Sequence, residues 1–318
     1  MSSNQKIILT VFIAYLLFNV IVSIVYSKKA EQNLHTSEEK KYFIGGRTMN
    51  GFVLAMTIMA TYTSASSFIS GPGAAGLTYG YAQTWIAAIQ VPVTFLVLGV
   101  LGNKLALVSR RTGAVTVAGY LKARYKSDAL VVITSLGLIV MCIGTFLFLF
   151  FVLRAGGGLA AVMSTADSLL ILTVAAIVKD LWKTYMVKDD PVKNESYEKH
   201  VKLVSTIFTL ILGAIVMVLT INPPDIIFLL NMFAFGGLEC TFLWPLVGGL
   251  FWKKGTKQAA VCSSVGAVAT YIFATYFIKI AGINAVVWGL LVGAILYFGV
   301  GEITGKDGLD QDILDTCF

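Results

Sequence analysis

The chain has 318 residues, of which 57% are hydrophobic and only 13% are charged, and its mean hydropathy is +0.81. So few polar side chains cannot cover a soluble globule, and the composition therefore indicates a largely lipid environment. The formal net charge of +7 alone would also suit a nucleic-acid-binding protein, but the positions of the basic residues, given below, argue against that class.

Runs without charged residues predict the membrane spans, because a bilayer core about 30 Å thick needs roughly 20 apolar residues per helix. Nine spans are predicted, two of which are interrupted by Asp167 and Glu239 respectively. Their ranges are 7–26, 49–72, 81–103, 129–153, 157–182, 203–222, 226–252, 258–278 and 281–301. Residues 1–318 are thus predicted to form one all-α polytopic membrane domain.

The basic residues alternate between the two sides of these spans. Of the 24 lysines and arginines, only Lys6, Arg154 and Lys279 fall on one side. Because basic loops stay in the cytoplasm, the N-terminus is predicted outside and the C-terminus inside, in a plasma or inner membrane. Orientation alone explains the basic loops, so no nucleic-acid partner is expected; the expected surroundings are the lipid bilayer.

The second span contains an unusual polar segment. Residues 59–76 read MATYTSASSFISGPGAAG, with six hydroxyl side chains between Thr61 and Ser67. Clustered hydroxyls followed by Gly-Pro-Gly are typical of a broken helix, whose unwound carbonyls face protein or a water-filled cavity. The alternative is that the small residues simply let neighbouring helices pack closely.

The fifth span carries a polar stripe. Ala161, Ser164, Thr165 and Ser168 follow the spacing i, i+3, i+4 and i+7 and therefore share one helix face. Their hydroxyls could bind a small cation, or could bond back to their own helix carbonyls. Asp167 lies beside the stripe and is a possible part of an ion path, because a carboxylate within a membrane is costly.

No enzymatic constellation accompanies these features. The only two histidines, His35 and His200, fall in predicted cytoplasmic loops, so a histidine-based dyad or zinc set within the membrane is not expected. Lys179 and Asp180 are predicted to cap the fifth span and anchor it at the interface. We therefore expect neither an enzyme nor an organic cofactor.

Three stretches resemble the sodium:solute symporter family: KKYFIGGRTMNGFVLAMTIMATYTSASSFISGPGAAG, MSTADSLLILTVAAIVKDLW and FGGLECTFLWPLVGGLFWKKG. The resemblance implies a LeuT-type inverted-repeat fold. It further implies import of a small organic solute by alternating access with Na+ as coupling ion. The segment ATYTSASSFISGPGAA favours pantothenate as the solute.

Site residues follow from the same resemblance. In this family the sodium site lies between the unwound first core helix and the helix that begins with MST. The matching sodium ligands are the carbonyls of Ala60, Thr63 and Ala161 and the hydroxyls of Ser164 and Thr165. The matching substrate contacts are Ser66 and Ser67, with Phe68 as a further pocket residue.

The chain departs from the family in its length. After Arg154 it passes directly into the segment resembling the MST helix, so about four central helices have no counterpart. The LeuT-type fold is therefore expected to be incomplete. A second hypothesis follows, in which the chain is a transport-inactive, internally deleted remnant or a membrane assembly partner of such a symporter.

Overall fold

The computed structural model of the chain describes residues 37–45, 50–62, 92–93, 95–154, 168–188, 190–219, 227–277, 283–305 and 317–318. Within these ranges every element is a helix. Four helices there are long and apolar enough to cross a membrane, in the windows Asp128–Thr145, Ala234–Phe251, Lys257–Phe277 and Ala285–Thr304. These observations confirm the predicted all-α membrane class.

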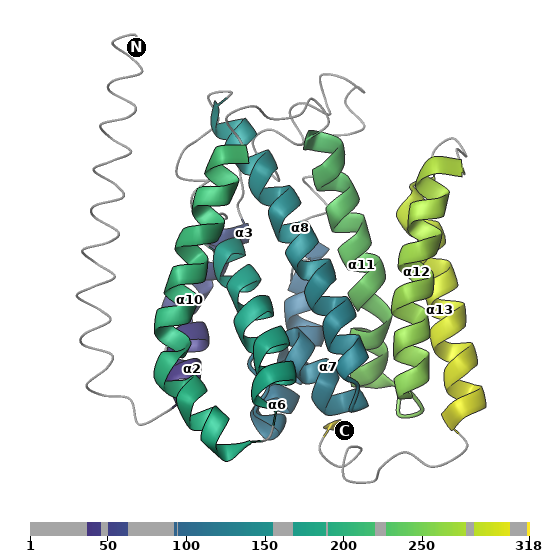
Figure 1. Cartoon of the computed structure of the whole chain (residues 1–318). Coiled ribbons are helices and arrows are strands. Elements are labelled where there is room, and N and C mark those ends of the chain that lie inside the picture. The colour runs from purple at the N-terminus through teal and green to yellow at the C-terminus, as the bar shows by residue number, and fades with distance from the viewer. Residues whose placement is uncertain are drawn as a thin grey trace.

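The first half of the described chain mixes short helices with one long one. Its elements are α2 (Glu38–Ile44), α3 (Gly51–Tyr62), the π-helix η4 (Val97–Gly102), α6 (Asn103–Thr112), α7 (Val117–Tyr125) and α8 (Asp128–Arg154). The second half is built from the π-helix η5 (Ala175–Val187), α10 (Pro191–Leu219), α11 (Ile227–Phe251), α12 (Lys257–Phe277) and α13 (Ala285–Thr304). Figure 1 shows the long helices α8, α10, α11, α12 and α13 running along a common direction, with α6 and α7 at one end.

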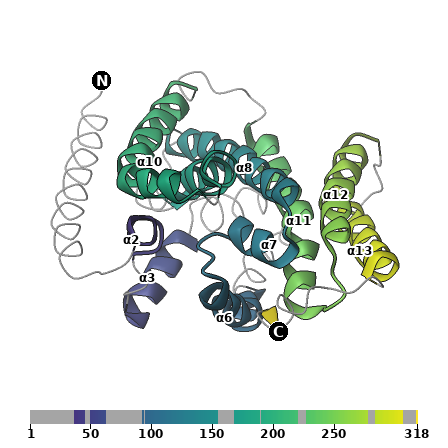
Figure 2. The same ribbon diagram turned by 60° about the horizontal axis from the view of Figure 1, so that its bottom comes forward.

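Helices α12 and α13 lie side by side, and both pack against α11 (Figures 1 and 2). Glycines make the close approach possible. A Cβ atom added to Gly289 would lie 2.9 Å from the carbonyl oxygen of Ala267, and one added to Gly293 would lie 2.9 Å from the Ala267 Cβ. Small residues at helix contacts are the usual packing device in membranes, where burial drives association only weakly.

Pro245 lies inside α11 and removes one backbone hydrogen bond. Proline has no N–H, so the carbonyl of Thr241, four residues earlier, loses its donor within the helix. The hydroxyl of Ser264 in α12 donates to this carbonyl at 2.9 Å. A neighbouring helix thus satisfies the carbonyl that proline leaves without a donor, as lipid cannot.

A second buried polar group ties α7 to the end of α11. The Arg124 side chain is 1% exposed, and its Nε donates to the carbonyl of Gly249 at 3.1 Å. Its Nη2 donates to the carbonyls of Trp252 and Lys253 at 3.4 and 3.3 Å. These carbonyls lie at the C-terminus of α11, where they lack partners within the helix. Arg124 therefore caps α11 from another element.

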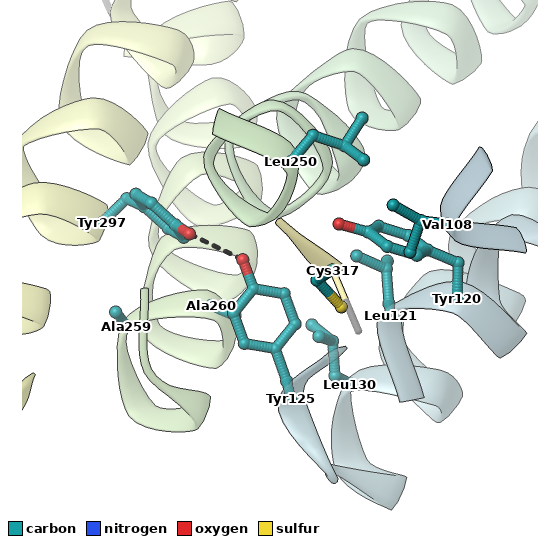
Figure 3. Close-up of a cluster of buried hydrophobic side chains, with 10 residues drawn as sticks. All are labelled: Val108, Tyr120, Leu121, Tyr125, Leu130, Leu250, Ala259, Ala260, Tyr297 and Cys317. Atoms are coloured by element: carbon teal, nitrogen blue, oxygen red, sulfur yellow. Dashed lines mark hydrogen bonds between the residues drawn. The ribbon is translucent and has the colours of Figure 1, made fainter. Parts of the chain in front are cut away.

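Tyrosines extend this contact into an apolar cluster. The Tyr125 hydroxyl donates to the carbonyl of Pro245 at 2.9 Å and lies 2.6 Å from the Tyr297 hydroxyl. Because Tyr125 has a single hydroxyl proton, Tyr297 is the donor in their shared bond. Figure 3 shows the cluster, made of Val108, Tyr120, Leu121, Tyr125, Leu130, Leu250, Ala259, Ala260, Tyr297 and Cys317.

On the other side of α8, a separate apolar cluster joins η5 to α10; its buried members are Val174, Val178, Val187, Tyr197 and Val201. Phe43 of α2 packs against this cluster. Helix α10 begins at Pro191, about three turns before the predicted span that starts at residue 203. The reason is that a charge-free run detects only the apolar part of a helix, whereas the first turns of α10 are charged.

Candidate functional site

Most of the predicted site residues lie outside the described residues. These are Thr63, Ser66, Ser67, Phe68, Ala161, Ser164, Thr165 and Asp167. Ala60 lies in the last turn of α3. The sodium and substrate sets therefore stay predictions. What the structure does describe is the chain on either side of them: α3 up to Tyr62, and the helix that is described from Ser168 onward.

The helix from Ser168 continues as η5 to Val187, which corrects one expectation. Lys179 and Asp180 were predicted to cap this helix and to anchor it at the membrane interface, and the predicted cap is wrong. Instead the helix runs beyond them, and Asp180 is only 4% exposed. Its Oδ1 accepts a hydrogen bond from the Thr116 hydroxyl at 2.5 Å. Thr116 also caps α7 by accepting from the Gly119 N–H at 2.9 Å, so η5 is joined to the start of α7.

The neighbouring lysines of η5 bind a buried carboxylate. Glu39, in the first turn of α2, is 3% exposed and forms ion pairs with Lys179 and with Lys183, the latter at 2.5 Å. The Glu39 N–H donates to Oε2 of Glu198 in α10 at 3.3 Å. The Lys183 Nζ also lies 5.0 Å from the centre of the Tyr197 ring. Three elements, α2, η5 and α10, thus meet at this carboxylate.

Electrostatics keep the Glu39 carboxyl ionised. Burial by itself raises its pKa, because a carboxylate loses hydration, but the charges and hydrogen bonds of Lys179 and Lys183 have the larger combined effect. The net result is a pKa below the ordinary value of 4.5. Glu39 is therefore a permanent anion at neutral pH, held between two cations.

A cavity of about 370 Å³ adjoins this ion cluster. It lies between η5 and the segment from Thr112 to Gly119. Its charged lining consists of Lys122, Lys179, Asp180, Lys183 and Lys188. Within the described ranges no group of three or more His, Cys, Asp or Glu side chains could hold a metal ion. Three of its four lysines are paired with carboxylates, Lys122 with Asp128, and Lys179 and Lys183 with Glu39.

Sequence reasoning missed Glu39 because it searched for carboxylates inside the predicted spans. A usable signal was nevertheless present. Lys179 and Lys183 are spaced i, i+4 and share one helix face next to an apolar stretch. Two cations on the buried side of a helix require an acidic partner, and two consecutive glutamates precede the YFIGGR segment.

The apolar spans, the proline-containing α11 and the capped helix ends define a polytopic α-helical membrane protein. The model of the sodium:solute symporter family matches residues 42–157 and 143–267, which together exceed half of the chain. The chain belongs to the sodium:solute symporter family. Members of this family are LeuT-type membrane transporters rather than enzymes; they move a small-molecule solute and use Na+ as the coupling ion.

Curated relatives refine the comparison. The chain is 27% identical to the sodium/pantothenate symporter of Escherichia coli over 482 residues, covering 96% of this chain and 98% of the relative. It is 27% identical to that of Haemophilus influenzae over 449 residues, covering 85% and 91% respectively. A sodium/proline symporter of Staphylococcus aureus is 25% identical over 228 residues, covering 70% of this chain and 42% of the relative. No solved structure matches this chain.

Proposed function

We propose that the chain imports pantothenate with sodium across the plasma or inner membrane. The choice of pantothenate as the substrate rests on how much of each relative's length aligns with this chain. The two sodium/pantothenate symporters align along 98% and 91% of their lengths, whereas the sodium/proline symporter aligns along 42% of its length. In these transporters the substrate site is built from helices that are far apart in the sequence. A relative that aligns along its whole length is therefore the better guide to the substrate.

The proposed sodium site joins two segments that flank described elements. Carbonyls of Ala60 and Thr63 come from the end of α3 and beyond it. The carbonyl of Ala161 and the hydroxyls of Ser164 and Thr165 come from the segment before Ser168. Five oxygen ligands suit a hard cation.

Substrate contacts are proposed for Ser66, Ser67 and Phe68, with Asp167 on the ion path. The proposed orientation has the N-terminus outside, which puts the lysine-lined cavity at the cytoplasmic end.

One observation favours the alternative of a transport-inactive remnant or assembly partner. The alignment to the Escherichia coli relative runs over 482 positions, whereas this chain has 318 residues. Positions equal to about half the length of this chain are therefore present in the relative alone. In LeuT-type transporters the repeats move against each other, so lost helices remove part of the moving machinery.

Uptake by reconstituted protein decides between the two. Proteoliposomes holding the purified chain are given labelled pantothenate with an inward gradient of sodium or, as control, of choline. Accumulation that requires sodium supports symport. Equal uptake with choline contradicts sodium coupling, and absence of uptake in vesicles that still bind sodium favours the inactive alternative.

Sodium affinity tests the ligand set. Ser164→Ala or Thr165→Ala removes one oxygen but little volume, so we expect sodium affinity to fall about tenfold or more at roughly 1.4 kcal/mol per decade. Ser168→Ala, one turn further along the same face, is the matched control and should bind sodium as the parent does. Parent-like binding by the first two variants contradicts the assignment.

A further inference from the structure

Cys317 and Phe318 lie in the core of the protein, although α13, the helix before them, ends at Thr304. Cys317 is 2% exposed and belongs to the buried cluster at the end of α11, and Phe318 packs against the same cluster. Figure 3 shows Cys317 in the middle of this cluster, and Figures 1 and 2 show the C-terminus at the end of the bundle where α6 and α7 lie. A short segment beyond α13 is thus seated against other elements.

The Phe318 ring is the common partner of three basic side chains. The Lys104 Nζ of α6 lies 5.0 Å from the ring centre, the Arg124 Cζ of α7 lies 5.5 Å from it, and the Lys253 Nζ, just beyond α11, lies 5.8 Å from it. A cation within about 6 Å of an aromatic ring centre is attracted by the negative face of the ring. Among the described residues, neither Lys104 nor Lys253 is paired with a carboxylate. One ring therefore joins three elements.

We propose that residues 317–318 form a strap, a segment that docks reversibly in this pocket and keeps the end of the bundle formed by α6, α7 and the end of α11 closed to water. The three basic side chains repel one another, so the docked ring favours their approach and its release favours their separation. The contact consists of one ring and one thiol, so the segment can leave without the unfolding of a helix. The inference does not depend on the proposed function.

The pocket has the means to survive release of the strap. Arg124 keeps its bonds to the three carbonyls at the end of α11, none of which belongs to the strap. Its Nη1, however, is buried and has no hydrogen-bond partner within the described part of the chain. A buried donor without a partner is costly, and water that enters on release can bond to it. The hydration of Arg124 thus offsets part of the contact that is lost, which suits a reversible strap.

Cys317 itself reports whether the strap is docked. Its buried thiol should react with N-ethylmaleimide only after the segment has left the pocket. The full chain is labelled in lipid nanodiscs, and mass spectrometry of its peptides reads the rate at each cysteine separately. Cys240, which is 0% exposed within α11, provides the check on folding.

Two substitutions of the ring test the docking. Phe318→Ala should speed labelling of Cys317 about tenfold or more, because the ring supplies both apolar burial and the contacts with cations. Phe318→Leu keeps an apolar side chain but no ring, so its rate should fall between those of the parent and Phe318→Ala. Labelling of Cys240 should stay as in the parent. Equal labelling of Cys317 in the parent and in Phe318→Ala overturns the docking.

Lys253 and Lys254 offer a matched pair for the role of charge. Lys253→Gln should speed labelling of Cys317 about two- to fivefold, as expected for a cation at a ring. Lys254→Gln removes the same charge from the next position, but Lys254 is paired with Glu302 at 2.9 Å, so this variant should label as the parent does.

A double-mutant cycle assigns the effect of Lys253 to the ring. In a Phe318→Leu background, Lys253→Gln should have no further effect, because the ring on which it acts is absent. Equal effects of the two lysine variants overturn the strap, as does an undiminished effect of Lys253→Gln in that background. The comparison of the two lysines needs no substitution in the strap, so it decides the matter even if Phe318→Ala does not fold.

Hydrogen exchange then tests whether the docked strap holds this end of the bundle closed. Protein that carries the maleimide adduct on Cys317 cannot dock the strap again, because the site leaves the thiol no free space. Exchange of the α7 amides should therefore rise about threefold or more, while exchange in α10, which lies outside this cluster, should not change. Cys317→Ser treated with the same reagent controls for adducts on the other cysteines. Parent-like exchange of α7 in the labelled protein means that the segment is seated passively, and it overturns the strap.

Discussion

Ser264→Ala removes the one hydroxyl that satisfies the proline-freed carbonyl in α11. The Ser264 hydroxyl donates to the Thr241 carbonyl at 2.9 Å, and Pro245 cannot supply the donor that a regular helix would. Ser263→Ala is the matched control. Ser263 is equally buried and donates at 2.8 Å to the carbonyl of Gly293, but that carbonyl lies inside the regular helix α13 and keeps its own donor.

The expected magnitudes differ for this reason. Losing a hydrogen bond between membrane helices costs about 0.6 kcal/mol on average when the acceptor keeps another partner. Leaving a buried carbonyl without any donor costs about 1–3 kcal/mol. Ser263→Ala should therefore lower the free energy of unfolding by about 0.6 kcal/mol, and Ser264→Ala by roughly two to five times as much.

Unfolding in bicelles by added SDS, followed by far-ultraviolet circular dichroism, measures both values. A double-mutant cycle then isolates the cause. In a Pro245→Ala background the backbone N–H returns to residue 245, so Ser264→Ala should cost no more than Ser263→Ala does. If Ser264→Ala and Ser263→Ala cost the same in the parent, or if the cycle shows no coupling, the account of the proline-freed carbonyl is wrong.

Three further predictions concern packing, pH and topology. Gly289→Ala should destabilise the protein by about 1–3 kcal/mol, because the new methyl group meets a backbone oxygen of α12 at 2.9 Å. Gly299→Ala is the control: its methyl group meets nothing within 4 Å, so this variant should be neutral in the same unfolding assay. Glu39 has a lowered pKa, so its stabilisation of α2 is present above its ordinary pKa of 4.5 and is lost as pH falls through the folded-state value. The difference in amide hydrogen exchange of α2 between the parent and Glu39→Gln should therefore be constant at neutral pH and vanish in acid. A difference that persists at the lowest pH contradicts this reasoning. Cysteines placed at Thr36 and Ser196 should react with an impermeant reagent only from the cytoplasm, and labelling of either one in intact cells refutes the predicted orientation.

Charge-free runs predicted the helical class because lipid disfavours unpaired charge. The absence of charge can be seen in each stretch of sequence without knowing what that stretch contacts. They did not predict where α10 begins, since its first turns are charged. The local signal for that start was present in Asp190 and Pro191. The Asp190 Oδ1 accepts from the N–H of Val192 at 3.0 Å, and Pro191 takes the first helical position.

The contacts at the candidate site are harder to predict, because they join residues far apart in the chain. Glu39 and Lys183 are 144 positions apart, and Thr116 and Asp180 are 64 apart. Spacing rules describe one helix at a time and do not state which helices meet. The family resemblance predicts a sodium site between two such helices, but most of its ligands lie outside the described residues, so that part stays a prediction.

The cap that Arg124 forms on α11 has a consequence for synthesis of the chain. Its acceptor at Gly249 follows 125 positions later. At about 5–20 residues per second, a ribosome needs roughly 6–25 s to make that stretch. During this interval the guanidinium has none of its three carbonyl partners and must remain hydrated or be held by another factor. Arg124 can therefore reach its buried position only after the end of α11 has been made, which places closure of this end of the bundle late in biogenesis.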